Sequence, residues 1–320
     1  MKPISLSFFV LFFISVNGQT TYLTSEEEKI PVGRGTLYGT LFTPVNPKKF
    51  PVVLLIAGSG PTDRDGNNIV LPGKNNSLLQ LADSLARHGI GTLRYDKRGV
   101  GKSRSDTIMK EESLTIDTIA SDAEAMYNWL KARGFNEIYI AGHSEGSLIG
   151  MMVALKVNPS GFISIAGAGR KIREILQEQL AGRLPSQLDS MLRIDLDSLE
   201  RGLSVTFVHP SLMSLLRPSV QPYMKSWLKL DPQKIMAQLK CPALIVQGSK
   251  DIQVSILDAH NLHAAMPDSR LLVVTNMNHI FKQVTSDDRN DNLKTYSDPS
   301  YPVMGELISG IVEFVKQPNK

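Results

Sequence analysis

The sequence has little that would indicate a disulfide framework, a nucleic-acid surface or a metal site. Its 320 residues include one cysteine, only 7% are aromatic, and the formal net charge is +4. The single thiol, Cys241, cannot pair within this sequence, and its place before Pro242 and an apolar run suits buried packing. Because the basic residues form no run and no stripe with aromatic residues, we expect no nucleic-acid partner.

Residues 1–18 have the pattern of a secretory signal peptide. Met1-Lys2 supplies a positive start, Ile4–Val16 is mostly apolar, and Val16 and Gly18 are suitably placed for cleavage. The apolar run is too short to span a bilayer comfortably, and no later segment is long and apolar enough to do so. We therefore expect a secreted or periplasmic protein without a membrane span after signal removal. An uncleaved anchor is the alternative.

Strands and helices are predicted to alternate along most of the chain. Short apolar runs, typical of strands buried on both faces, precede amphipathic segments of helical period. Such βαβ units form a mostly parallel central sheet flanked by helices, so the predicted fold class is α/β. The expected strands are Thr21–Ser25, Thr36–Thr43, Val52–Ala57, Ile90–Tyr95, Glu137–Ala141, Gly161–Ala166, Ala243–Gln247 and Arg270–Thr275, and the expected helices are Ser77–His88, Thr115–Lys131, Ser147–Val157, Ser255–Met266 and Val303–Lys316.

The alternation breaks between Arg170 and Lys240. This stretch has helical periodicity and no convincing strand, and its prolines punctuate short helices. We expect a helical cap, residues 170–240, inserted into an α/β core of residues 19–169 and 241–320. Some of its apolar residues, among them Met213 and Trp227, are expected to line a substrate pocket.

The segment Gly142-His143-Ser144-Glu145-Gly146 fits the pattern G-x-S-x-G between a predicted strand and a predicted helix. A nucleophilic serine needs a very tight bend there, and glycines on both sides allow the backbone to approach closely. The N-terminus of the following helix stabilises negative charge at the site. Ser144 is therefore the candidate nucleophile, and a plain glycine-rich turn is the alternative.

A serine hydroxyl needs a base to accept its proton. His279 is the candidate, because it lies in a polar loop directly after the last predicted strand, where a base can reach over the sheet edge. The other histidines lie in places that suit a base less well. One ends a helix, one is adjacent to Ser144 and would point elsewhere, one lies in the cap, and two lie in an amphipathic helix. They are His88, His143, His209, His260 and His263.

The base needs a carboxylate that fixes its tautomer. Asp251 follows the strand Ala243–Gln247, and the order serine, aspartate, histidine is the one expected for this architecture. Asp258 is the rival, but helical register would hold it on the flank of the sheet. A simple helix cap is the alternative role for Asp251.

Two backbone amides are needed to bind an oxyanion. The amide of Glu145 directly follows the nucleophile, and the amide of Ser59 lies in Gly58-Ser59-Gly60-Pro61 after an early strand. The polar run Asp63–Asn68 either orders the rim of the site or is a solvated loop. No cluster has metal-ligand spacing and no phosphate-binding or dinucleotide-binding motif is complete, so we expect neither a metal nor a cofactor.

The sequence resembles α/β-hydrolases of the bacterial secreted esterase and serine-aminopeptidase-like group. The resemblance covers essentially the whole chain after residue 18 and is weakest in the early cap. One departure is Ala57-Gly58, where many relatives have His-Gly. The matching segments are Gly58–Asn67, Asp96–Ser103, Gly142–Gly146, Gly248–Val254 and Asn278-His279.

This resemblance implies an α/β-hydrolase fold with an inserted helical cap, and a serine hydrolase that cleaves small-molecule carboxylic esters through an acyl-enzyme. A peptidase or an acyltransferase with the same three residues is the alternative, since the cap carries Asp195, Asp197 and Glu200, which suit a substrate amine. A non-catalytic binding protein on a hydrolase scaffold is the third possibility. The sequence leaves the natural substrate and the oligomeric state open.

Overall fold

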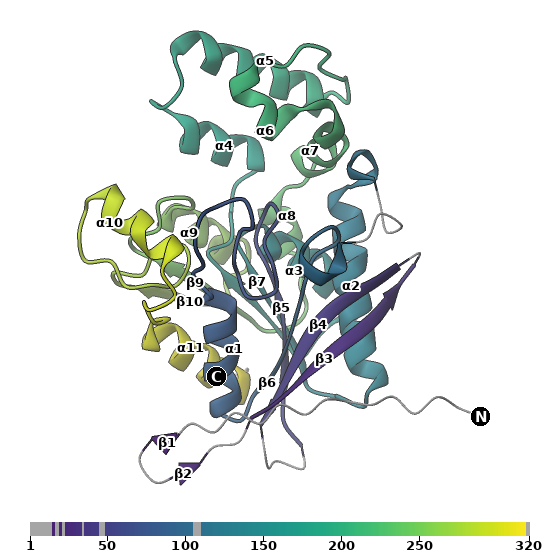
Figure 1. Cartoon of the computed structure of the whole chain (residues 1–320), viewed down its shortest axis with the longest axis vertical. Coiled ribbons are helices and arrows are strands. Elements are labelled where there is room, and N and C mark those ends of the chain that lie inside the picture. The colour runs from purple at the N-terminus through teal and green to yellow at the C-terminus, as the bar shows by residue number, and fades with distance from the viewer. Residues whose placement is uncertain are drawn as a thin grey trace.

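The computed structural model of the chain (Figure 1) describes residues 15–16, 19–20, 23–33, 35–44, 49–104 and 110–317. The predicted signal peptide, residues 1–18, therefore lies outside the described residues except for positions 15–16. These two residues form β1 (Ser15–Val16), which pairs antiparallel with β2 (Gln19–Thr20).

The larger sheet of the described chain has eight strands in the order β10-β9-β8-β7-β5-β6-β4-β3. The strands β3 and β4 form an antiparallel hairpin at one edge of the sheet, where β4 also pairs antiparallel with β6. The strands from β5 to β10 run parallel to one another. The mostly parallel α/β sheet predicted from the sequence is thus confirmed. The strands are β3 (Leu23–Val32), β4 (Gly35–Pro44), β5 (Val52–Ile56), β6 (Gly91–Tyr95), β7 (Ile138–His143), β8 (Gly161–Ile165), β9 (Ala243–Gly248) and β10 (Arg270–Val274).

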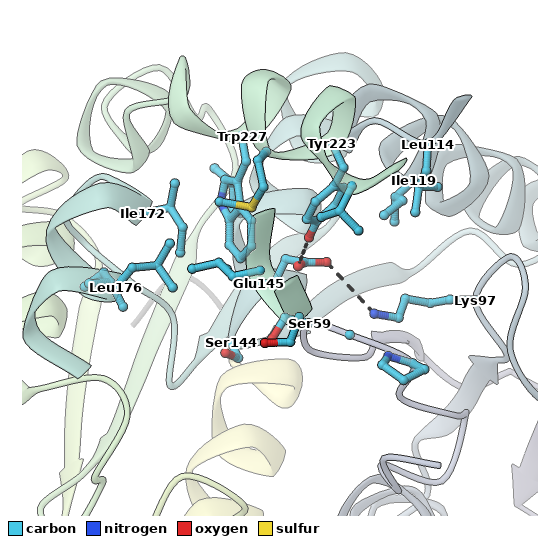
Figure 2. A pocket seen from close by; sticks show the side chains of 18 of the residues that line it. Ser59, Lys97, Leu114, Ile119, Ser144, Glu145, Ile172, Leu176, Tyr223 and Trp227 are labelled. Carbon is cyan, nitrogen blue, oxygen red and sulfur yellow. Dashed lines mark hydrogen bonds and ion pairs between the residues drawn. The ribbon is translucent and has the colours of Figure 1, made fainter. Parts of the chain in front are cut away.

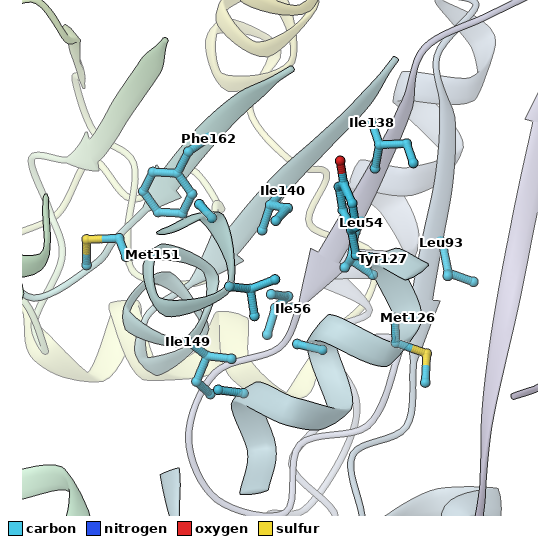
Figure 3. Close-up of a cluster of buried hydrophobic side chains, with 14 of the residues drawn as sticks. Leu54, Ile56, Leu93, Met126, Tyr127, Ile138, Ile140, Ile149, Met151 and Phe162 are labelled. Carbon is cyan, nitrogen blue, oxygen red and sulfur yellow. The ribbon is translucent and has the colours of Figure 1, made fainter. Parts of the chain in front are cut away.

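Helices cover both faces of the sheet, and the central strands β5 to β9 are mostly apolar and buried at every position. On β5, Leu54 and Ile56 face one core, whereas Val53 and Leu55 face the other. The first core contains α2 (Ile116–Ala132), α3 (Glu145–Val157) and α9 (Ile256–Ala265); the second contains α1 (Ser77–Arg87) and α11 (Gly305–Lys316). Figure 3 shows the first core, in which Leu54 and Ile56 lie beside side chains of β7, α2 and α3.

Between β8 and β9 the chain forms only helices and turns, and α4 to α7 gather at one end of the molecule (Figure 1). This inserted segment has its own apolar core, which includes Leu192, Leu196, Leu212 and Leu228. Its elements are α4 (Ile172–Leu180), α5 (Ser186–Glu200), the 3₁₀ turns Pro210–Leu212 and Pro218–Val220, α6 (Met213–Leu216), α7 (Gln221–Leu228) and α8 (Pro232–Met236).

The last of these helices differs from the expected division into cap and core. Met236 at the end of α8 and Leu239 after it are buried in the first core of the sheet, with Ala259 and Leu262 of α9. The residues from α8 onward therefore pack with the sheet rather than with α4 to α7. Shorter elements complete the described chain: α10 (Arg289–Lys294) and the 3₁₀ turns Gly101–Ser103, Glu111–Ser113 and Thr295–Ser297. Among the described helices, none has both the length and the apolar character needed to cross a bilayer.

Candidate active site

Ser144 lies in a strained bend between β7 and α3. Its backbone has φ 56° and ψ −120°, a combination that L-residues rarely adopt. The amide of Ser144 donates to the carbonyl of Ile165 at 2.9 Å, and the amide of Ser147 donates to the carbonyl of Ser144 at 2.9 Å. The end of β8 and the first turn of α3 therefore hold the strained conformation in place.

Glycines on both sides of Ser144 make this bend possible. A Cβ atom on Gly142 would collide with the carbonyl of Gly146, and one on Gly146 would collide with the carbonyls of Ile56 and Ala57. The backbone at the end of β5 thus passes directly against the start of α3. Only glycine fits at these two positions, as the G-x-S-x-G pattern predicts.

Asp251 and His279 meet although 28 residues separate them in the sequence. His279 Nδ1 donates to Asp251 Oδ2 at 2.7 Å, and the two side chains are only 4% and 1% exposed. The carboxylate also accepts from the amides of Gln253 and Val254 and from Nε2 of Gln247. Four donors therefore fix the carboxylate, which in turn fixes the orientation of the imidazole ring.

A buried asparagine shapes the turn that carries His279. Asn278 Oδ1 accepts from the amides of Ile280 and Lys282, and its Nδ2 donates to Asn292 Oδ1 and to Thr295 Oγ1. The segment around α10, which the sequence analysis left unassigned, thus anchors the turn after β10.

His143 is hydrogen-bonded to the backbone of His279. Its Nε2 donates to the carbonyl of His279 at 2.9 Å, and the two ring centroids are 4.7 Å apart. Since His143 precedes Ser144 in the chain, this bond holds the loop of His279 beside the strained bend. Burial, reinforced by the neighbouring His279 ring, lowers the pKa of His143 to about 3, so this ring stays neutral.

Asp258, the alternative candidate for the carboxylate, binds other residues and not His279. It caps α9 through Ser255 and forms an ion pair with Arg170 at 2.8 Å. The remaining histidines have the local roles expected of them: His88 ends α1, His209 caps a 3₁₀ turn, His263 bonds Ser269 and His260 is exposed. In the described chain, none of these residues lines the pocket beside Ser144.

The loop that follows β5 lies against Ser144, the candidate nucleophile. A Cβ atom on Gly58 would lie 3.3 Å from Cβ of Ser144, and Ser59 and Glu145 line the same pocket as Ser144. Figure 2 shows Ser59 next to Ser144 at the base of this pocket. Both residues predicted to supply oxyanion amides thus border the nucleophile.

The polar run Asp63–Asn68 is tied to the core by hydrogen bonds instead of forming a solvated loop. Asp63 Oδ1 accepts from the amides of Asp65 and Asn67, which closes a tight turn. Arg64 is buried and donates to Asp96, from its amide at 2.9 Å and from Nη2 at 2.8 Å. Asp96 therefore joins this run to the segment after β6, of which Lys97–Val100 line the pocket, whereas Asp63–Asn68 lie outside its lining.

The pocket over Ser144 has a volume of about 770 Å³, within the range of small-molecule sites. Its walls come from the core and from the inserted segment, and most side chains of the inserted segment in it are apolar. The prediction that Trp227 lines the pocket is confirmed, but the prediction for Met213 is wrong: this side chain is 41% exposed and lies outside the lining. The apolar lining residues from the inserted segment are Ala168, Ile172, Ile175, Leu176, Leu215, Val220, Tyr223, Met224, Trp227 and Pro232.

Sequence reasoning missed two polar groups at this site. Lys97 and the hydroxyl of Tyr223 both contact Glu145 inside the pocket wall (Figure 2). The only sequence signal for Lys97 is its place in the segment Asp96–Ser103, and the only signal for Tyr223 is its place in the predicted cap. No group of side chains in the described ranges is arranged to hold a metal ion.

The chain is similar to several known hydrolases. A family model described as serine aminopeptidase, S33, matches residues 73–204, which is less than half of the chain. Esterase EstD of Thermotoga maritima is 28% identical over 259 residues, and the match covers 80% of this chain but only 60% of the length of EstD.

Solved structures show the same fold. An esterase of Pyrococcus furiosus matches with a TM-score of 0.58 at 17% identity, covering 92% of this chain and 91% of that one. Est1E from Butyrivibrio proteoclasticus, solved with ferulic acid bound, matches with a TM-score of 0.56 at 18% identity, covering 85% and 96%. The predicted resemblance to α/β-hydrolases is thereby confirmed, and the fold of this chain is the α/β-hydrolase fold.

The buried, neutral His143 makes the stability of the protein depend on pH. An unfolded histidine titrates near 6.5, whereas His143 in the folded protein titrates at about 3. Between these values the unfolded chain binds the additional proton, so stability falls as the pH decreases through this window, by up to about 1.4 kcal/mol per pH unit. Replacing His143 by Gln, which keeps a donor for the His279 carbonyl, should reduce this slope.

The measurement is the free energy of unfolding from urea titrations between about pH 4 and pH 7. The exposed His260→Gln serves as the matched control and should leave the slope unchanged. An identical slope for wild type and His143→Gln would show that His143 does not titrate in the manner described.

Proposed function

We propose that this chain, which has the α/β-hydrolase fold, is a serine hydrolase that cleaves carboxylic esters through an acyl-enzyme intermediate. In this proposal Ser144 is the nucleophile, His279 is the general base and Asp251 orients the base. The backbone amides of Ser59 and Glu145 bind the oxyanion. The observation that carries the proposal is the buried Asp251–His279 pair held beside the strained bend of Ser144.

The proposed reaction has two halves of the same form. His279 Nε2 accepts the proton of Ser144 Oγ while Oγ attacks the ester carbonyl, and the oxygen of the tetrahedral intermediate becomes negative. The alcohol then leaves with the proton from His279, which produces the acyl-enzyme. Water, deprotonated by His279, attacks the acyl carbon and releases the acid. Asp251 stays ionised throughout and stabilises the imidazolium.

The pocket supports an ester with a sizeable apolar group. Side chains of α2, α4 and α7 line it, including Ile119, Leu176 and Trp227, and its volume of about 770 Å³ exceeds what an acetyl group needs. An apolar wall favours an acyl or alkoxy group of several carbons by roughly 0.8 kcal/mol per buried methylene. We therefore expect esters of medium-length acids to be better substrates than acetate esters.

The alternative peptidase activity needs a group that binds a substrate amine. The acidic residues of the inserted segment do not supply one at this pocket: Asp197 and Glu200 pair with Arg173, and neither they nor Asp195 line it. Two carboxylates outside that segment do line the pocket, but Glu111 pairs with Arg217 and Glu145 lies beside Lys97, so the arrangement supports ester cleavage over aminopeptidase activity. An acyltransferase would share every step up to the acyl-enzyme and differ only in the second nucleophile.

Replacing Ser144 by Ala should abolish ester hydrolysis while leaving the fold intact. Without the hydroxyl no acyl-enzyme forms, and kcat should fall by roughly 10⁴-fold or more. His279→Ala should be nearly as damaging, because the two residues act as one unit. The measurement is kcat and KM with a p-nitrophenyl ester, together with thermal unfolding of each variant.

Ser59→Ala is the matched control, since it removes a hydroxyl from the same pocket but keeps the backbone amide. It should retain activity within a few-fold of the wild-type value. A well-folded Ser144→Ala variant that keeps most of its activity would exclude Ser144 as the nucleophile. Faster cleavage of aminoacyl anilides than of esters by the wild-type protein would favour the peptidase alternative.

The inserted segment should determine which ester is preferred. Trp227 and Leu176 line the pocket, so their replacement by Ala should change the ratio of kcat/KM between long and short acyl esters by roughly tenfold. Met213→Ala, which changes an exposed residue of the same segment outside the lining, is the matched control and should leave the ratio unchanged. An equal loss for every ester in the two pocket variants would contradict a role in selectivity.

We also propose that the protein is exported to the periplasm or beyond, which the pattern of residues 1–18 supports. Expressed with a carboxyl-terminal tag in a Gram-negative host, the protein should appear in the periplasmic fraction with a new amino terminus near Gln19. A variant that lacks residues 2–18 should stay in the cytoplasm. Recovery of the intact chain from the cytoplasm, beginning at Met1, would contradict this proposal.

A further inference from the structure

A buried lysine lies behind the proposed oxyanion site. The side chain of Lys97 is 6% exposed and that of Glu145 is 1% exposed, although both residues are ionisable. Lys97 Nζ donates to the carbonyl of Gly58 and lies 3.9 Å from Glu145 Oε1. The hydroxyl of Tyr223, on α7, donates to Glu145 Oε2. Figure 2 shows this chain of contacts from the core to the inserted segment.

Such an arrangement is costly for stability. Removing an ammonium and a carboxylate from water costs several kcal/mol per ion, and their mutual attraction recovers this only with good geometry and further hydrogen bonds. Here the separation is 3.9 Å, and Glu145 Oε1 has no hydrogen-bond donor in the described part of the chain. Burial also lowers the pKa of Lys97, while the charge of Glu145 opposes this shift. Because the pairing of Lys97 with Glu145 is unfavourable for stability, we infer that it has a function in the site.

The peptide group between Gly58 and Ser59 explains what this lysine does. In a trans peptide the carbonyl oxygen and the amide hydrogen point in opposite directions from one plane. A cation that holds the Gly58 carbonyl therefore also fixes the direction of the Ser59 amide, and it polarises that amide toward a stronger donor. The partner of Lys97 is the side chain of Glu145, whose own backbone amide is the other proposed donor. One ammonium thus connects the two halves of the oxyanion site.

We propose that Lys97 is a positioning residue that aligns the Ser59 and Glu145 amides with the oxyanion of the transition state. Tyr223 extends this network to the inserted segment, so a segment that contacts substrate also contacts the residue that supplies an amide. This inference rests on the proposed function, because it requires an oxyanion to form at Ser144. It predicts that removal of the Lys97 ammonium lowers kcat and leaves KM nearly unchanged, because the ester itself binds mainly through the apolar walls.

Lys97→Met tests the proposal, because it keeps an apolar stem of similar length and removes the ammonium. We expect kcat to fall by about 10²-fold, the scale of losing one oxyanion donor, with KM changed by less than about threefold. Lys102→Met is the matched control: it removes a lysine from the same segment, 62% exposed and paired with Glu27, and should leave both constants unchanged. Retention of wild-type kcat by a folded Lys97→Met variant would overturn the proposal.

The second measurement uses an alkyl trifluoromethyl ketone, which adds to a nucleophilic serine and forms a tetrahedral oxyanion. Its inhibition constant should rise in Lys97→Met by the same factor by which kcat/KM falls. A lysine needed only for folding would lower the melting temperature without changing the inhibition constant of the folded fraction. That result would also overturn the proposal.

A double variant removes the effect of an unpaired buried charge. Lys97→Met with Glu145→Gln lacks both ions and keeps both backbone amides, so it should recover stability lost by Lys97→Met but not the lost kcat. If the double variant regains wild-type kcat, the unpaired carboxylate, and not the loss of positioning, caused the defect. The proposed function is tested separately with the wild-type protein. If the wild-type protein cleaves no ester and the trifluoromethyl ketone does not add to Ser144, the proposed function is wrong, independently of any result with Lys97 variants.

Discussion

Close contact between backbone segments at Ser144 is the constraint on which the rest of the site depends. The end of β5, the end of β7 and the start of α3 approach so tightly that neither Gly142 nor Gly146 can carry a side chain. This contact forces Ser144 into its strained conformation and brings the loop of Ser59 against it. The apolar strands and the helices on both faces of the sheet supply the packing that maintains this strain.

Several buried ionisable groups around this bend have partners that limit their freedom. Asp251 receives four hydrogen bonds and holds His279, while Asp96 joins the run Asp63–Asn68 to the segment after β6. Lys97 and Glu145 differ in that their pairing is incomplete, and their position behind the two amides gives that incompleteness a function. Preorganised dipoles of this kind are worth more in a water-poor pocket than in solution.

The parts of this account that the sequence predicts are those encoded locally. Some features can be recognised from a few neighbouring residues, such as the continuous apolar run Val52–Ile56 and the glycines around Ser144. The order of Ser144, Asp251 and His279 can be recognised from their succession along the chain. Contacts between distant segments were not predictable in this way. Helical periodicity marks Met213 and Trp227 alike as apolar, but only the packing of α6 and α7 decides which of them reaches the pocket. The pairing of Lys97 with Glu145 joins the loop after β6 to the first residue of α3, and no spacing in the sequence indicates it.

The central claim is that Ser144 is a nucleophile activated by His279 and held at an oxyanion site. Mass spectrometry of the folded protein after reaction with a fluorophosphonate tests it most directly, because this reagent phosphonylates an activated serine. The account predicts one phosphonyl group per chain, located on the peptide that contains Ser144, with loss of esterase activity in proportion to labelling. An active enzyme that remains unlabelled, or that carries the label on a different residue, would contradict it.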